Sequence, residues 1–90
     1  MSEENKELPT VYVERLGGSI TMLRTYVDEE EISHLLVALE GLKDEPESEL
    51  AMRKVMNAFD ELGIVQGAVL NYATYLKVLL PQIKNSFGDD

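Results

Sequence analysis

Few side chains of this 90-residue sequence are suited to catalysis. The sequence contains one histidine, His34, and no cysteine, and the histidine directly follows Ser33. A serine nucleophile needs a histidine within hydrogen-bonding distance and a third group that orients the imidazole ring. Adjacent residues of a helix point about 100° apart, so Ser33 and His34 cannot form that pair. The sequence therefore predicts a protein that is not an enzyme, with His34 at the surface or at its boundary.

Two clusters of carboxylates are the candidate metal ligands. Residues 28–31 are four consecutive acids, and residues 44–49 contain four more around Pro46. Consecutive residues of a helix fan outward instead of converging on one ion, and the second cluster lacks the spacing of a calcium-binding loop. Gly17-Gly18 is too short for a phosphate-binding loop. We therefore expect neither a bound metal ion nor a cofactor.

The charge of the chain is distributed unevenly. Residues 1–49 contain 13 acidic and 4 basic side chains, whereas residues 50–90 contain 4 of each. The net charge of −9 therefore belongs to the first part. An acidic surface repels phosphate backbones and acidic membranes, and it attracts basic partners.

Length and composition indicate one small domain. Residues 1–9 are charged and poor in apolar side chains, which predicts a disordered acidic arm. Residues 10–85 are expected to form the domain, and residues 86–90 a polar tail. The polar, acidic start differs from a signal peptide, and the absence of cysteine suits a reducing compartment. These features predict a cytoplasmic protein.

The segment around Gly17-Gly18 fits two structures. A helix would place apolar residues at steps of three and four, and a hairpin would turn at the two glycines. Two glycines inside a helix cost about 2 kcal/mol relative to alanine, and the flanking β-branched residues prefer strands. We therefore predict an α+β fold, an N-terminal β-hairpin followed by three α-helices; the alternative is an all-α four-helix bundle. The apolar positions of the helical alternative are Val13, Leu16, Ile20, Leu23 and Val27.

Three helical segments are expected after residue 27. The first covers residues 28–42 and begins with Asp28 as its N-cap. The second covers residues 48–62, with Ser48 as N-cap and Gly63 as a left-handed C-cap. The third covers residues 64–80, and Pro81 ends or kinks it. The expected inner face of the second helix consists of Leu50, Val55, Met56, Phe59 and Leu62.

The third helical segment is apolar on all sides, with Lys77 as its one charged residue. A membrane span needs about 20 apolar residues, and Gln66, Asn71 and Thr74 interrupt this shorter run, so no membrane insertion is expected. A domain this small has difficulty covering such a helix, which predicts a protein partner or a homo-oligomer such as a dimer. The alternative is that the same residues form the core of the monomer. The interface candidates are Val65, Val69, Tyr72, Tyr75, Leu76 and Leu79.

A glycine-centred motif lies at the start of this segment. Gly63 is followed by the aliphatic Ile64, and the branched Val69 stands six residues after the glycine. This pattern over residues 62–72 resembles the turn and recognition helix of phage-repressor-type helix-turn-helix proteins. The resemblance implies a DNA-binding transcription regulator that uses residues 50–77. The side chains implied to face the major groove are those of Gln66, Gly67, Leu70 and Asn71.

Three departures from that pattern argue against DNA binding. Phe59 stands where the family has a small residue, and Val65 and Leu70 are apolar where the base-reading face is polar. No arginine or lysine occurs between Lys54 and Lys77, although contacts with phosphates normally supply most of the affinity. Nucleic acid is therefore not the expected partner.

The sequence thus predicts a non-enzymatic protein–protein interaction module, a small acidic regulator or adaptor that associates with itself. The acidic residues 28–31 and 44–49 would steer it toward a basic partner, and salt would weaken that steering. The alternative is the helix-turn-helix transcription regulator.

Overall fold

The computed structural model describes residues 8–87, and this part of the chain is helical without any strand. The predicted arm at residues 1–9 and tail at residues 86–90 lie mostly outside it. Within the described part, Leu8 packs against the core and Ser86 belongs to the last helix. The elements are α1 (Val13–Tyr26), a 3-10 turn η2 (Glu29–Glu31), α2 (Ser33–Asp44), α3 (Glu49–Asp60), α4 (Val65–Tyr72) and α5 (Tyr75–Ser86).

The predicted N-terminal β-hairpin is wrong, because residues 13–26 form the continuous helix α1. The α+β class is therefore replaced by the all-α alternative, with five α-helices instead of four. Helix α1 buries Leu16, Ile20 and Leu23 against the other helices. Each such side chain contributes about 1.5–3 kcal/mol when buried, which outweighs the helical cost of the two glycines. A lone hairpin would also have kept two unpaired edges.

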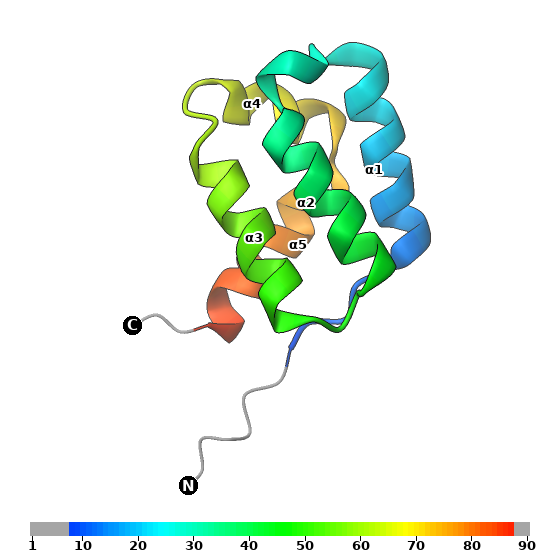
Figure 1. Cartoon of the computed structure of the whole chain (residues 1–90), viewed down its shortest axis with the longest axis vertical. Helices are drawn as coiled ribbons and strands as arrows, with labels where there is room; N and C mark the ends of the chain where they lie inside the picture. Colours follow the sequence, from blue (N-terminus) through cyan, green and yellow to red (C-terminus); the bar gives the residue numbers. More distant parts are fainter. Residues whose placement is uncertain (1–7, 88–90) are drawn as a thin grey trace, which may run out of the picture.

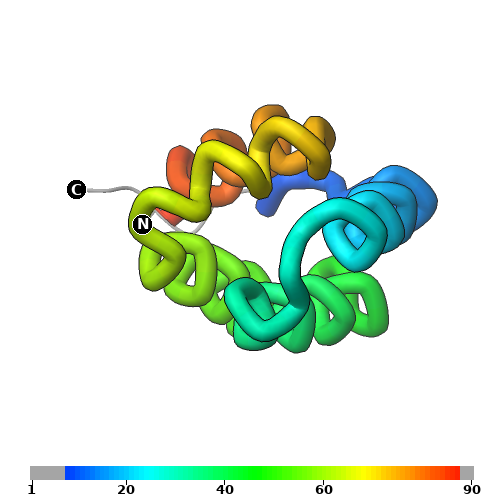
Figure 2. The backbone as a smooth tube through the Cα atoms, turned by 90° about the horizontal axis from the view of Figure 1, so that it is seen from above, coloured from blue at the N-terminus to red at the C-terminus, as the bar shows by residue number. Residues whose placement is uncertain are grey.

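The helices surround one core (Figure 1). Helices α2 and α3 pack against each other, and α1 contacts α2, α4 and α5. Figure 2 shows α2 and α3 on one side of the molecule, α4 and α5 on the opposite side, and α1 beside both. Helix α5 packs against both α1 and α3, so it covers the core on the side opposite α2 (Figure 2).

The ends of the middle helices follow local rules. The predicted cap Ser48 is confirmed, since its hydroxyl oxygen accepts a hydrogen bond of 3.1 Å from the N–H of Ala51. Gly63 has a φ of +61°, the left-handed conformation expected of it. Asp28 accepts a bond of 2.9 Å from the N–H of Glu30, but it begins the 3-10 turn η2 and not α2 itself.

The third predicted helix is two helices with a corner at Ala73, which has φ −98° and ψ 71°. A straight helix that is apolar on all sides would expose part of its apolar surface to water. The corner lets α4 bury Val69 and lets α5 bury a separate face of its own. Helix α5 also continues through Pro81 to Ser86, so the expected end at residue 80 is wrong. In residues 8–87 no helix is long and apolar enough to cross a membrane.

Candidate functional site

The predicted interface residues of the third segment lie mainly inside the chain. Val69, Leu76 and Leu79 are fully buried. Tyr75 is almost fully buried, and its hydroxyl oxygen accepts a hydrogen bond of 3.0 Å from the N–H of Tyr12. Val65 and Tyr72 are half-buried and pack against the core. These positions offer a partner little more surface than the outer parts of Val65 and Tyr72.

The residues of the DNA-binding alternative are divided between the interior and the surface. Helices α3 and α4 are joined by the turn at Gly63, so the connectivity of a helix-turn-helix is present. The side-chain amide of Gln66 is half-buried and donates a hydrogen bond of 3.1 Å to the carbonyl of Phe59. Leu70 packs against the core, whereas Gly67 and Asn71 are exposed.

The side chains considered for catalysis are separated. Nδ1 of His34 lies 3.3 Å from a carboxylate oxygen of Glu61, and both side chains are exposed. Ser33 instead lines a hollow beside Arg24. In the part of the chain that the structure describes, no three histidine or acidic side chains come together as metal ligands.

One surface of α2 combines exposed apolar side chains with carboxylates at both of its ends. Val37 is 72% exposed and Leu50, at the start of α3, is 63% exposed. A hollow of about 470 Å³ lies on one side of Val37, and one of about 300 Å³ lies on the other. Val37 lines both hollows, so they form one continuous surface, which we call the α2 surface.

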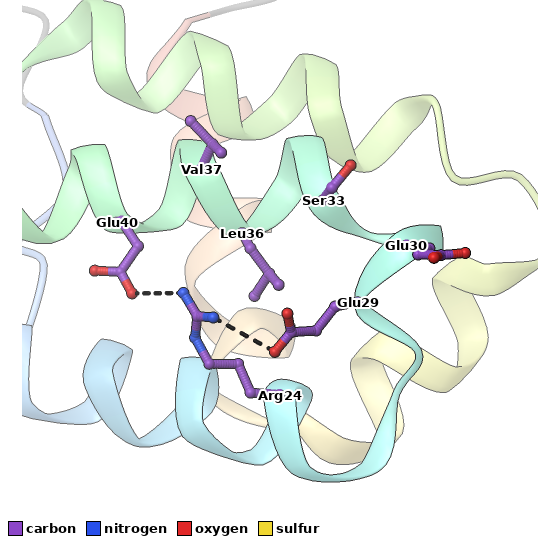
Figure 3. A pocket seen from close by; sticks show the side chains of 7 residues that line it. All are labelled: Arg24, Glu29, Glu30, Ser33, Leu36, Val37 and Glu40. Atoms are coloured by element: carbon purple, nitrogen blue, oxygen red, sulfur yellow. Dashed lines mark hydrogen bonds and ion pairs between the residues drawn. The ribbon is translucent and has the colours of Figure 1, made fainter.

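The first hollow lies between α1 and α2 (Figure 3). Arg24 extends from α1 and contacts Glu29 at 3.5 Å and Glu40 at 3.2 Å. In this view Val37 extends away from Arg24, toward α3. Exposed ion pairs of this kind contribute about 0–1 kcal/mol each, so they are readily exchanged for contacts with a partner. The hollow is lined by Arg24, Glu29, Glu30, Ser33, Leu36, Val37 and Glu40.

The second hollow lies between α2 and α3. Its floor contains Gly41, where an added Cβ would meet no atom within 4 Å. Exposed Val37 and exposed Leu50 line the same hollow as Gly41, so apolar side chains from both helices border it. The hollow is lined by Val37, Ala38, Gly41, Asp44, Glu45, Ser48, Leu50, Ala51 and Lys54.

The electrostatics of the α2 surface are acidic. Its two hollows contain five carboxylates and two cationic side chains. Four of the five carboxylates come from the two acidic segments of the sequence, since Glu29 and Glu30 precede α2 whereas Asp44 and Glu45 lie at its end. The fifth, Glu40, lies within α2. The fold therefore places two separate acidic segments at the two ends of one apolar patch.

A second apolar surface lies between α1 and the α4–α5 corner, which we call the tyrosine groove. It has a volume of about 900 Å³, and Arg15 is the one charged side chain among its lining residues. Tyr12 and Tyr75 form an edge-to-face pair with ring centres 6.5 Å apart, and Tyr26 stacks on Tyr72 at 5.0 Å. The groove is lined by Arg15, Gly18, Ser19, Thr21, Met22, Asn71, Tyr72, Thr74, Tyr75 and Val78.

Sequence reasoning missed the centre of the α2 surface and the α1 side of the tyrosine groove, although Tyr72 and Tyr75 of that groove were among the interface candidates. Leu50 was expected on the inner face of its helix, but it lies in the first turn and points to solvent. Val37 lies outside the apolar stripe of α2, and that mismatch was the available signal. For the groove, the signal was the stripe through Tyr12, Met22 and Tyr26 on α1, which stays hidden unless this segment is taken as a helix.

The comparisons with other proteins provide no relative from which a site could be transferred. No protein-family model matches the chain, and searches of curated proteins and of solved structures found no significant match.

Proposed function

We propose that this chain is a non-enzymatic protein–protein interaction module that docks a basic, amphipathic helical segment of a partner on the α2 surface. The observation that carries the proposal is the arrangement around Val37. An exposed apolar patch lies between two acidic segments that are about a dozen residues apart in the sequence.

The apolar part of the surface supplies contact energy. Val37 and Leu50 are mostly exposed, and fully burying a side chain of this size contributes about 1.5–3 kcal/mol. Both line the hollow that contains Gly41, where an added Cβ would meet no atom within 4 Å, so an apolar side chain of the partner would enter this hollow. Helical partners that dock in a groove present such side chains at steps of three and four residues.

The acidic part selects the charge of the partner. Glu29 and Glu30 lie at one end of the patch, and Asp44 and Glu45 lie at the other. A segment with lysines or arginines on both sides of its apolar stripe would meet carboxylates at each end. Such complementarity mainly raises the association rate and rejects acidic partners, and it weakens with salt.

The test compares two surface variants of the same chemical kind. The double variant Val37→Ser, Leu50→Ser removes the apolar patch, and Ile64→Ser removes an apolar side chain that is 95% exposed in the turn between α3 and α4. Binding of a labelled amphipathic helix of leucines and lysines is measured by fluorescence anisotropy. We expect the double variant to raise the Kd at least tenfold and Ile64→Ser to leave it unchanged. If the wild type, the double variant and Ile64→Ser bind the peptide with the same Kd, the proposal is contradicted.

The same variants identify the natural partner. Tagged protein is purified from its native host with nuclease present, and mass spectrometry compares the proteins that copurify. A partner of this surface is retained by Ile64→Ser, lost by the double variant, and contains a basic amphipathic segment. Recovery of specific DNA without nuclease, lost in the Gln66→Ala, Asn71→Ala variant, would instead support the helix-turn-helix function.

A further inference from the structure

The tyrosine groove shares no lining residue with the α2 surface and differs from it in chemistry. Its lining includes Met22 and Val78, which are 40% and 51% exposed, and no carboxylate. We propose that this groove is a self-association interface in which two copies of the chain pack through the same face about a two-fold axis. This inference is independent of the proposed docking of a basic partner.

The surface of α1 has the spacing of a helix-packing face. Exposed or groove-lining residues recur along it at steps of three and four, beside the stripe that fills the core. This repeat is the pattern with which one helix packs along another. The chain thus carries two packing stripes on α1, and the helices of the same molecule cover one of them. The outer stripe consists of Tyr12, Arg15, Ser19, Met22 and Tyr26.

The four tyrosines of the chain lie at or beside the groove: Tyr72 and Tyr75 line it, and the exposed Tyr12 and Tyr26 contact them. Tyr75 is itself almost fully buried, so the other three supply the accessible ring surface. One pair, Tyr12 with Tyr75, lies near the start of α1, and the other, Tyr26 with Tyr72, lies near its end. Tyrosine and methionine are enriched at protein interfaces because they supply large contact areas at a small cost in conformational entropy. The ring contacts already hold these side chains in place, which lowers that cost further.

The charge distribution makes this groove the described surface on which a second copy of the chain meets the least repulsion. Two molecules of charge −9 repel each other, and contact through an acidic face would bring carboxylates together. The α2 surface contains five carboxylates, whereas the residues that line the groove include none. Contact through the tyrosine groove therefore brings no carboxylate of its lining against the other copy. A two-fold dimer also pairs apolar Met22 and Val78 with an equally apolar face.

The experiment measures molar mass by sedimentation equilibrium from about 1 to 500 µM, at low and high sodium chloride. We expect the mass to approach twice the 10.1 kDa of one chain, with tighter association at high salt because the salt screens the repulsion between the copies. Met22→Glu and Val78→Glu each place a carboxylate in the groove and should weaken association at least tenfold. Ile64→Glu adds the same charge outside the groove and should change the Kd less than twofold.

Three outcomes would overturn the proposal. The first is a monomer at every concentration and salt level. The second is a loss of association in Ile64→Glu as large as that in Met22→Glu and Val78→Glu. It would mean that any added negative charge weakens association, wherever it lies on the surface. The third is dimerisation that Met22→Glu leaves intact while its circular dichroism and Tm match the wild type. The Val37→Ser, Leu50→Ser variant should dimerise normally, so failure of this proposal and failure of the α2 docking site are distinguishable.

Discussion

Gly63 shows how one residue sets the direction of the chain between α3 and α4. Its φ of +61° lies in the left-handed region, where a Cβ would approach the following carbonyl oxygen. Gly67, four residues later, lies inside α4 with ordinary helical geometry and open space around it. The same substitution should therefore have opposite effects at the two glycines.

We predict that Gly63→Ala lowers the free energy of unfolding by about 1–2 kcal/mol, because alanine is strained at this φ. Gly67→Ala should raise it by about 1 kcal/mol, because alanine is the better helix former. Urea denaturation followed by circular dichroism measures both. A similar change for the two variants would mean that the left-handed turn is not required.

The side chains at the centre of the α2 surface contribute little to folding. Val37 and Leu50 are mostly exposed, and substitutions at such positions usually change stability by less than about 0.5 kcal/mol. Leu39, on the inner side of α2, is fully buried. The surface and the core of α2 are thus separable by mutation.

Accordingly, Val37→Ser and Leu50→Ser should each leave the Tm within about 2–4 °C of the wild type, which is the shift that a change of about 0.5 kcal/mol produces in a domain of this size. Leu39→Ala removes buried methyl groups and should lower the free energy of unfolding by about 2–5 kcal/mol. Thermal unfolding of the three variants checks this. A large loss of stability in Val37→Ser would show that Val37 has a structural role.

At the scale of elements, α3 depends on a local cap and α5 tolerates an internal proline. The hydroxyl of Ser48 accepts a bond from the N–H of Ala51, one of the N–H groups that an α-helix leaves without a partner at its start. Pro81 lies within α5, where it has no N–H to donate to the carbonyl four residues earlier. Burial of Leu79, Leu80 and Ile83 around it keeps this helix continuous.

Ser48→Ala should therefore cost about 1 kcal/mol of stability, whereas Ser48→Asp should retain most of it, since aspartate caps a helix in the same way. Equilibrium denaturation of the pair separates the cap from other effects of the serine. Equal destabilisation by both substitutions would show that the hydrogen bond from the N–H of Ala51 does not account for the stability that Ser48 contributes.

Pro81→Ala should raise the free energy of unfolding by about 1–3 kcal/mol, because it restores the missing helical bond and removes the ring. Pro81 is exposed, so the substitution leaves no cavity in the core. The measurement is the shift of the urea midpoint at an unchanged m-value. A decrease in stability would mean that the proline itself shapes the path of α5.

At the scale of the whole molecule, charge separates two faces with opposite properties. The α2 surface is acidic, and the tyrosine groove has no acidic lining residue. Salt screens the attraction of the first for a basic partner and the repulsion between two copies at the second. The two interactions should therefore respond to ionic strength in opposite directions.

Between 0.05 and 0.5 M sodium chloride we expect the Kd for a basic amphipathic peptide to rise about tenfold or more and the Kd of self-association to fall. Anisotropy and sedimentation on the same protein samples give the two values. If both interactions weaken together, both depend on attraction between opposite charges, and the groove is not the site of self-association.

The sequence alone determined those features that depend on contacts within one or two turns of the chain. Ser48 defined the start of α3 and Gly63 the left-handed turn that follows it, because a cap and a left-handed residue act through their immediate neighbours. The end of α3 at Asp60, two residues before the predicted end, was not determined in this way. The acidic character of residues 28–31 and 44–49 was equally plain, because charge does not depend on folding. The helix-turn-helix connectivity around Gly63 belongs to the same local class.

Only the tertiary structure decided between a hairpin and a helix at residues 13–26. Both patterns provide an apolar face, and local propensity favours strands, but only a helix places Leu16, Ile20 and Leu23 together against three other helices. Packing also turned the chain at Ala73, because a straight apolar helix would have left apolar surface in water. The two candidate surfaces were not predictable for the same reason: each is made of segments that meet only after the core has formed.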